Sequence, residues 1–365
     1  MRRSMLVGTG LLALGLAIAP AALAQAGYTP PKTSWGVPDL QGNWTNASIT
    51  RMTRPPGIDA LVLTPEQAKK LEDGDYNNIR TREELKPTDQ KEGAPEKGKP
   101  LPPVGNYNAV WVDPGAHVAV VNGEARSSWI TVPANGRIPY KPGRGAGRYE
   151  EAPLPAATAA KADPKAAAAA RASAASRSYE GPESRSVGER CIVGFGNTGG
   201  PVMNNVLYNN TYQIVQSPGH AMILVEMVHD ARIIPIVASK ADAKHDPSAI
   251  KKWLGDSVGW YEGATLVVET KNVHPQQRGY VSDNGKMTER FTRTEDGVIL
   301  YQFEIDDPDQ YSQVWKGEMP MRTATGAVYE YACHEGNYGL LGILEGARQQ
   351  ERRGGKLELT ADDEG

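Results

Sequence analysis

Few of the motifs that identify common enzyme classes occur in this sequence. It contains no His-Glu-x-x-His zinc motif. Its glycine-rich loop, residues 194–200, lacks the Lys-Ser/Thr pair of a P-loop and does not lie between a strand and a helix. We therefore predict a protein that uses no metal and no cofactor.

Cysteine is scarce, because the chain has only Cys191 and Cys333. Two distant cysteines without Cys-x-x-Cys spacing give little support for a metal site. In an oxidising compartment they would form one disulfide bond. A disulfide that closes so long a loop would stabilise the fold by roughly 5 kcal/mol.

Long hydrophobic runs are absent after residue 24. Arg2 and Arg3 precede an apolar run and the small residues 22–24, the pattern of a secretory signal peptide cleaved after Ala24. We predict a periplasmic or secreted protein that has no membrane span. The formal net charge of -3 gives no reason to expect a nucleic acid partner.

Composition divides the chain after the signal peptide (residues 1–24) into four segments. Residues 25–140 hold a Pro-rich strap, a short helix with a capping-box start at residues 64–67, and the first strands. Residues 141–187 form an Ala/Pro-rich insertion that we predict to be disordered. Residues 188–350 form the β-rich core, and residues 351–365 form a mobile tail.

The core alternates between short strands and tight turns. Pro218-Gly219, Glu262-Gly263 and Asp296-Gly297 are typical of hairpin turns. Eight or nine strands in sequence order predict a mainly β fold, an antiparallel meander that closes into a lipocalin-like β-barrel, with short helices and long N-terminal loops. The sequence also predicts strands at 107–112, 127–132, 313–322 and 328–333 and helices at 247–254 and 337–348.

Several long blocks resemble a family of uncharacterised secreted proteins from Gram-negative bacteria. The blocks include LYNNTYQIVQ (207–216), MILVEMVHDARIIP (222–235) and YEYACHEGNYGL (329–340). Ala264 departs from the family pattern, which has Asp in that turn. The resemblance covers about half of the chain and implies the compartment and the fold rather than an activity.

The strongest candidates for catalytic residues lie in the predicted strand 221–228 and directly after it. Glu226 stands inside this apolar run, where an unpaired charge would cost several kcal/mol or more. Strand alternation places Asp230 and Arg232 on the same face as Glu226, and His229 on the other. These residues could form either a buried salt-bridge cluster or a catalytic site, with Arg232 stabilising negative charge.

A second candidate is His334, which would be fixed beside the disulfide and flanked by Glu335. A histidine in this setting suits general acid–base catalysis, although it could equally cap the last helix. Metal binding by paired histidines has no supporting motif.

Polar and aromatic residues of the strands could line the barrel and hold a ligand. The predicted ligand-binding residues are Tyr212, Trp260, Glu269, Arg290, Glu304 and Tyr331. The resulting hypothesis is a cofactor-free enzyme, a lyase, isomerase or hydrolase, that acts on a small organic molecule in the barrel lumen. The alternatives are a lipocalin-like binding or carrier protein without catalysis and a structural protein whose barrel is filled by side chains.

Overall fold

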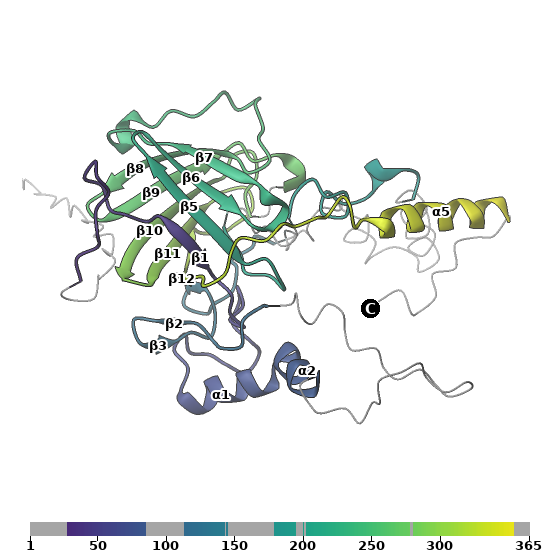
Figure 1. The fold of residues 1–365 in the computed structure, drawn as a ribbon, viewed down its shortest axis with the longest axis horizontal. Helices are drawn as coiled ribbons and strands as arrows, with labels where there is room; N and C mark the ends of the chain where they lie inside the picture. The colour runs from purple at the N-terminus through teal and green to yellow at the C-terminus, as the bar shows by residue number, and fades with distance from the viewer. Residues whose placement is uncertain are drawn as a thin grey trace, which may run out of the picture.

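The computed structural model describes residues 28–84, 113–142, 144, 179–194, 200, 202–277 and 280–353. The predicted signal peptide, the strand predicted at 107–112 and most of the Ala/Pro-rich insertion lie outside these residues. The described part is mainly β, as predicted, and is built around a nearly closed barrel (Figure 1).

Nine strands follow one another around the barrel, and their order differs from a simple meander. The order is β7 (Ala231–Pro235), β6 (His220–Val225), β5 (Thr211–Ser217), β1 (Gly42–Thr45), β12 (Trp315–Thr323), β11 (Val298–Asp306), β10 (Lys286–Glu295), β9 (Thr265–Lys271) and β8 (Asp256–Glu262). Strand β1 therefore lies between β5 and β12, although it comes first in the sequence. The three predicted hairpin turns are confirmed, since they join β5 to β6, β8 to β9 and β10 to β11.

The barrel closes between β7 and β8, which run parallel to each other. A ring of nine strands must contain a parallel pair, because strictly alternating directions require an even number. The contact between β7 and β8 includes an isolated bridge from Ile236 to Gly259, and the Val237 amide donates to the Gly259 carbonyl over 2.8 Å. Parallel neighbours need a long connection, and residues 236–255 supply it by crossing from one end of the barrel to the other.

Alternation along the strands fills the barrel with large side chains. Trp44, Tyr212, Phe291, Tyr301 and Trp315 are each at most 2% exposed and belong to one continuous hydrophobic core. Because aromatic side chains bury large areas, this layer holds opposite walls together.

The smaller elements lie below the barrel in Figure 1. They are helices α1 (Pro65–Gly74) and α2 (Tyr76–Glu84) and the short hairpin β2 (Val120–Val121) and β3 (Glu124–Ala125). Helix α1 begins with the predicted capping box between Thr64 and Gln67. Strand β4 (Ile130–Val132), within the predicted 127–132 segment, pairs with β12.

Two local predictions are wrong. Residues 247–254 form no helix, because the crossover is held by contacts with the barrel, including the bond from the Lys252 amide to the Asn272 carbonyl. Residues 328–333 form no strand, because both edges of β12 are already paired with β1 and β11. Residues 324–337 instead form an arm, which leads to helix α5 (Tyr338–Arg352) projecting away from the barrel (Figure 1).

The close approach of β12 and β11 gives a testable prediction at Gly317. A Cβ there would lie 2.2 Å from Phe303 Cζ and 2.8 Å from the Trp129 carbonyl oxygen. We expect Gly317→Ala to lower the free energy of unfolding by about 1–3 kcal/mol, measured by urea denaturation. Gly326→Ala is the control, since its Cβ would have no neighbour closer than 3.9 Å; equal losses in both variants would contradict the prediction.

Candidate functional site

Glu226 lies at the end of β6, where it binds backbone amides. Its carboxylate accepts hydrogen bonds from the Thr211 amide over 3.1 Å and from the Tyr329 amide over 2.9 Å. The side chain is buried, but it is held between the start of β5 and the arm rather than in the barrel interior. Glu226 therefore fastens the arm to the barrel.

The strand predicted to continue through Val228 ends at Val225, and this separates the predicted cluster. Val228 and His229 have φ angles of 62° and 47°, so the chain turns sharply before β7 begins. His229 is exposed and Asp230 is partly buried. Burial raises the pKa of Asp230, and the neighbouring His229 opposes that rise. Neither side chain joins Arg232 in the interior.

Arg232 points into the barrel and forms a buried ion pair with Glu289 of β10. Both guanidinium Nη atoms donate to the Glu289 carboxylate, one of them over 3.0 Å, and the two side chains are 1% and 0% exposed. The Tyr301 hydroxyl donates to the same carboxylate over 2.7 Å. Ser257 and Thr270 accept from Arg232 over 3.4 and 3.3 Å.

The environment of this pair shifts the pKa of Arg232 and of the neighbouring tyrosines. Burial alone would lower the pKa of Arg232, but the facing Glu289 carboxylate raises it overall. Burial, followed by the charge of Glu289, also raises the pKa of Tyr301 well above its usual value. Tyr212 lies nearby, and burial raises its pKa as well. Glu289 is 0% exposed and already accepts from three donor atoms, so it is poorly placed to take a proton from a substrate.

Ser257 lies at the centre of residues 255–259, which match the Gly-x-Ser-x-Gly spacing of hydrolase nucleophiles. Here the serine lies within β8 instead of at a strand-to-helix turn. Its hydroxyl is buried and bonded to Thr270 over 2.9 Å. In the described part of the chain its hydroxyl is bonded to Arg232 and Thr270 and to no histidine, so the motif does not form a nucleophile elbow.

Four predicted ligand-binding residues face away from the interior. Arg290 pairs with Glu262 over 2.7 Å, and Glu304 pairs with Lys316. Trp260 donates from its indole nitrogen to Glu262 over 2.8 Å. Glu269 also belongs to this outer face. The prediction that Glu269 and Glu304 line the lumen is therefore wrong, because the opposite face of each strand packs into the core.

The predicted disulfide between Cys191 and Cys333 is confirmed. It joins the arm to the loop that contains Cys191 and precedes β5. Close to it, Tyr331 stacks on Tyr208 with ring centroids 6.1 Å apart, whereas His334 is exposed. His334 lies far along the arm from Arg232 in the interior, so the predicted catalytic residues do not form one site.

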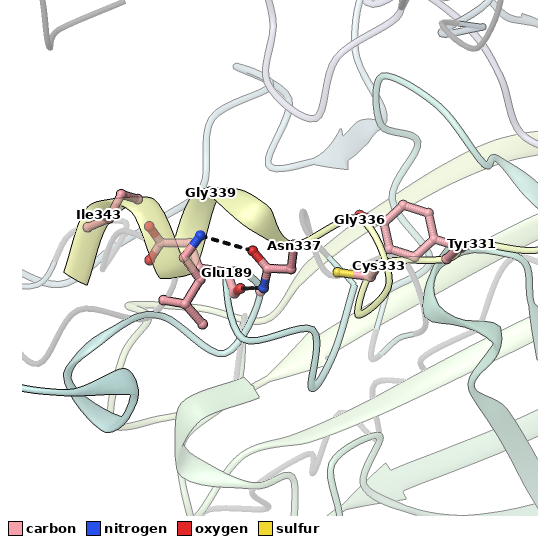
Figure 2. Close-up of a pocket in the computed structure, with 10 residues that line it drawn as sticks. Glu189, Tyr331, Cys333, Gly336, Asn337, Gly339 and Ile343 are labelled. Atoms are coloured by element: carbon pink, nitrogen blue, oxygen red, sulfur yellow. Dashed lines mark hydrogen bonds between the residues drawn. The ribbon is translucent and has the colours of Figure 1, made fainter. Parts of the chain in front are cut away.

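A pocket of about 440 Å³ lies beside the disulfide (Figure 2). We call it the clasp pocket, and it is lined by Gly188, Glu189, Tyr331, Ala332, Cys333, Gly336, Asn337, Gly339, Leu340 and Ile343. Asn337 begins α5 and accepts a hydrogen bond from the Leu340 amide over 3.2 Å. Its amide nitrogen donates to the Glu189 carbonyl over 2.7 Å and to Cys191 Sγ over 3.5 Å.

A second cavity, of about 470 Å³, lies at the end of the barrel where β9 and β11 end and β10 begins. We call it the His245 cleft. It is lined by His245, Asp246, Ser248, Lys271, Asn272, Asp283, Asn284, Gly285, Lys286, Asp306 and Pro308. Most of these side chains are polar, and they come from the crossover and from three segments around the strand ends.

His245 connects the crossover to the outside of the barrel. Its Nδ1 lies 3.0 Å from Asp256 of β8, and its Nε2 lies 3.1 Å from Glu269 of β9. The bond with Glu269, opposed by burial, raises the pKa of His245. The same bond with His245 lowers the pKa of Glu269 to about 2. Burial would raise the pKa of Asp256, but bonds from Lys252, the Asp246 amide and His245 lower it overall.

Sequence reasoning missed this histidine, although a signal was available. His245-Asp246 is a His-acid pair of the same kind as His229-Asp230 and His334-Glu335, which drew attention. The partners of His245 on β8 and β9 depend on the path of the crossover, which no local pattern reveals.

Comparison with known proteins adds no assignment. No protein-family model matches the chain, and no match is found among curated proteins. The resemblance to secreted Gram-negative proteins therefore stays a prediction.

Within the described ranges, no three or more His, Cys, Asp or Glu side chains are grouped so that they could hold a metal ion. None of the helices in that part of the chain has the length and apolar character needed to cross a membrane.

The buried ion pair predicts a large effect of removing one partner. Arg232→Ala leaves the Glu289 carboxylate buried without its cation, so we expect a loss of about 3–5 kcal/mol in the free energy of unfolding. Urea denaturation measures this loss. Arg290→Ala breaks an ion pair whose side chains are 39% and 45% exposed, and it should cost less than about 1 kcal/mol. Similar losses in the two variants would contradict the interpretation.

The raised pKa of His245 predicts a pH dependence of stability. Protonated His245 stabilises the fold fully below its unfolded-state pKa of about 6.5, and this contribution is lost as pH rises through the higher folded-state value. The lowered pKa values of Asp256 and Glu269 act in the opposite direction and cost stability only in acid. The urea midpoint of the wild type should fall as pH rises from about 6 to 8, and that of His245→Gln should change much less. Parallel curves would show that His245 is not responsible.

Proposed function

We propose that this is a periplasmic or secreted protein that binds a small, neutral, polyhydroxylated molecule of the saccharide type in the His245 cleft, without converting it. The observation that carries the proposal is the cleft itself. Its volume of about 470 Å³ lies within the range of small-molecule sites. Its polar lining suits a ligand with many hydroxyl groups rather than an apolar one.

The balance of charge in the cleft supports a neutral ligand. Basic and acidic side chains line it in equal number, three of each: His245, Lys271 and Lys286 against Asp246, Asp283 and Asp306. A strongly charged ligand would be repelled by the side chains of like charge, either the basic or the acidic ones. A ligand with hydroxyl groups can accept from the ammonium groups and donate to the carboxylates.

Binding is better supported than proton transfer in the barrel lumen. The interior carboxylate of Glu289 already accepts from Arg232 and Tyr301. Glu226 accepts from two backbone amides. The compartment is supported by the disulfide, since such bonds are rare in reducing compartments, and by the N-terminal signal pattern.

The test uses the full chain and a panel of neutral saccharides, sugar acids and fatty acids. Titration calorimetry measures binding, and nuclear magnetic resonance of the same samples measures conversion. We expect binding of a neutral saccharide without new products. Binding of fatty acids alone, or no binding by any neutral saccharide, would overturn the proposal.

Matched variants locate the site. Lys286 and Asp306 lie 3.6 Å apart in the cleft, with side chains 37% and 41% exposed. Replacing either with Ala should weaken binding by about tenfold, the effect of losing one hydrogen bond to a charged group. Lys316→Ala is the control, because Lys316 is 42% exposed and pairs with Glu304 outside the cleft. An equal effect of Lys316→Ala would place the ligand elsewhere.

The cofactor-free acid–base enzyme is the second candidate, and one observation favours it. His245 holds a carboxylate at 3.1 Å from Nε2 and lies at the cleft, an arrangement typical of a general acid–base pair. Both ring nitrogens are engaged, so one bond would have to open first. Product formation that is lost in His245→Gln would support this candidate over simple binding.

A further inference from the structure

The disulfide between Cys191 and Cys333 has two sulfur atoms in unequal surroundings. Cys191 is 3% exposed, whereas Cys333 is partly exposed and lines the clasp pocket. Figure 2 shows the Cys333 sulfur beside the Asn337 side chain. An incoming thiolate can therefore approach Cys333 from the pocket, whereas Cys191 is covered.

Cys191 is placed to leave as a thiolate. The Asn337 amide donates to Cys191 Sγ over 3.5 Å, and Asn337 is the residue from which α5 begins. A hydrogen-bond donor and the positive end of a helix both lower the pKa of a thiol. A leaving thiol with a lower pKa departs faster in disulfide exchange.

The backbone conformation of Cys191 is a second reason to expect that the disulfide opens. Its φ angle of 57° lies in the left-handed region, which is costly for a residue other than glycine. The disulfide helps to hold the residue in this conformation. Breaking the bond allows the backbone to relax, which favours opening of the loop that contains Cys191.

We propose that the Cys191–Cys333 disulfide is a thiol–disulfide exchange site, opened by a protein dithiol that attacks Cys333 from the clasp pocket. The first thiolate of the partner forms a bond with Cys333 Sγ, and the Cys191–Cys333 bond breaks with Cys191 leaving as a thiolate. The second thiol of the partner then attacks the mixed disulfide and releases Cys333. The partner is oxidised to a disulfide, and two electrons and two protons pass to the two cysteines of this protein.

Opening the bond removes the cross-link between the arm that leads to α5 and the loop that contains Cys191. The remaining contacts include the bond from Asn337 to the Glu189 carbonyl and the stacking of Tyr331 on Tyr208. The amide of Tyr329 stays bonded to Glu226. The arm is thus retained near the barrel up to Tyr331, while α5 gains freedom to move.

The first experiment identifies the attacked sulfur in the native full-length chain. Reduced glutathione is the probe, mixed disulfides are trapped by rapid alkylation, and mass spectrometry locates the adduct. We expect the adduct on Cys333 in about tenfold excess over Cys191, at a rate that does not depend on global unfolding. Adducts on Cys191, or exchange only when urea unfolds the chain, would overturn the proposal.

Variants of Asn337 separate a chemical role from a structural one. Asn337→Ala removes the donor and the helix cap, and Asn337→Asp keeps a cap but places a carboxylate near the leaving sulfur. We expect reduction by dithiothreitol to be slower by about tenfold in Asn337→Ala and slowest in Asn337→Asp. If Asn337 only caps the helix, the disulfide of Asn337→Ala should be reduced faster than that of the wild type. The disulfide of Asn337→Asp, which keeps a cap, should then be reduced at the wild-type rate.

A third measurement addresses the leaving group directly. In Cys333→Ser the thiol of Cys191 is free to titrate, and ultraviolet absorbance follows its thiolate. We expect a pKa below the usual value of about 8.5. A pKa at or above that value would contradict the proposed stabilisation of the leaving thiolate.

Discussion

The ion pair between Arg232 and Glu289 holds the barrel together where its backbone pairing is weakest. Arg232 lies on β7, its hydroxyl partners Ser257 and Thr270 lie on β8 and β9, and Glu289 lies on β10. The pair therefore spans the junction between β7 and β8, where the strands are parallel and joined by an isolated bridge. Side-chain bonds between buried groups replace part of the backbone hydrogen bonding that other strand pairs have.

The crossover closes the same junction from the outside. It leaves β7, passes to the other end of the barrel and returns to β8, with His245 bonded to strands β8 and β9. Within the interior pair, the facing Glu289 carboxylate raises the pKa of Arg232, so the arginine keeps its charge at ordinary pH. The outer contact changes with pH, because His245 titrates. The junction between β7 and β8 is thus held by the Arg232–Glu289 ion pair inside the barrel and by the pH-dependent contact of His245 outside it.

Local patterns in the sequence predict the hairpins, the mainly β fold and the disulfide well. They do not predict the place of β1 between β5 and β12 or the parallel junction, because these join residues far apart in the chain. Alternation correctly groups Glu269 with Val267, but apolar residues occur on both faces of β9, so the pattern cannot say which face is inside. Glu226 is identified because a charge within an apolar strand needs a partner, and strand alternation then adds Arg232 on the same face. Glu226 was assigned to the wrong place, because Val228 adopts a left-handed backbone that its β-branched side chain disfavours.

Because the number of strands is odd, the barrel has one parallel junction, between β7 and β8, at which it can open. Strands β5 to β7 form one coherent sheet and β8 to β12 another, and β1 links them through continuous hydrogen bonding on the opposite side. A fluctuation that separates β7 from β8 can therefore leave every antiparallel ladder intact. The two sheets then move apart by rotating about β1. Amide hydrogens in the antiparallel ladders stay protected in such an event, while Arg232 and Glu289 on the inner walls meet water.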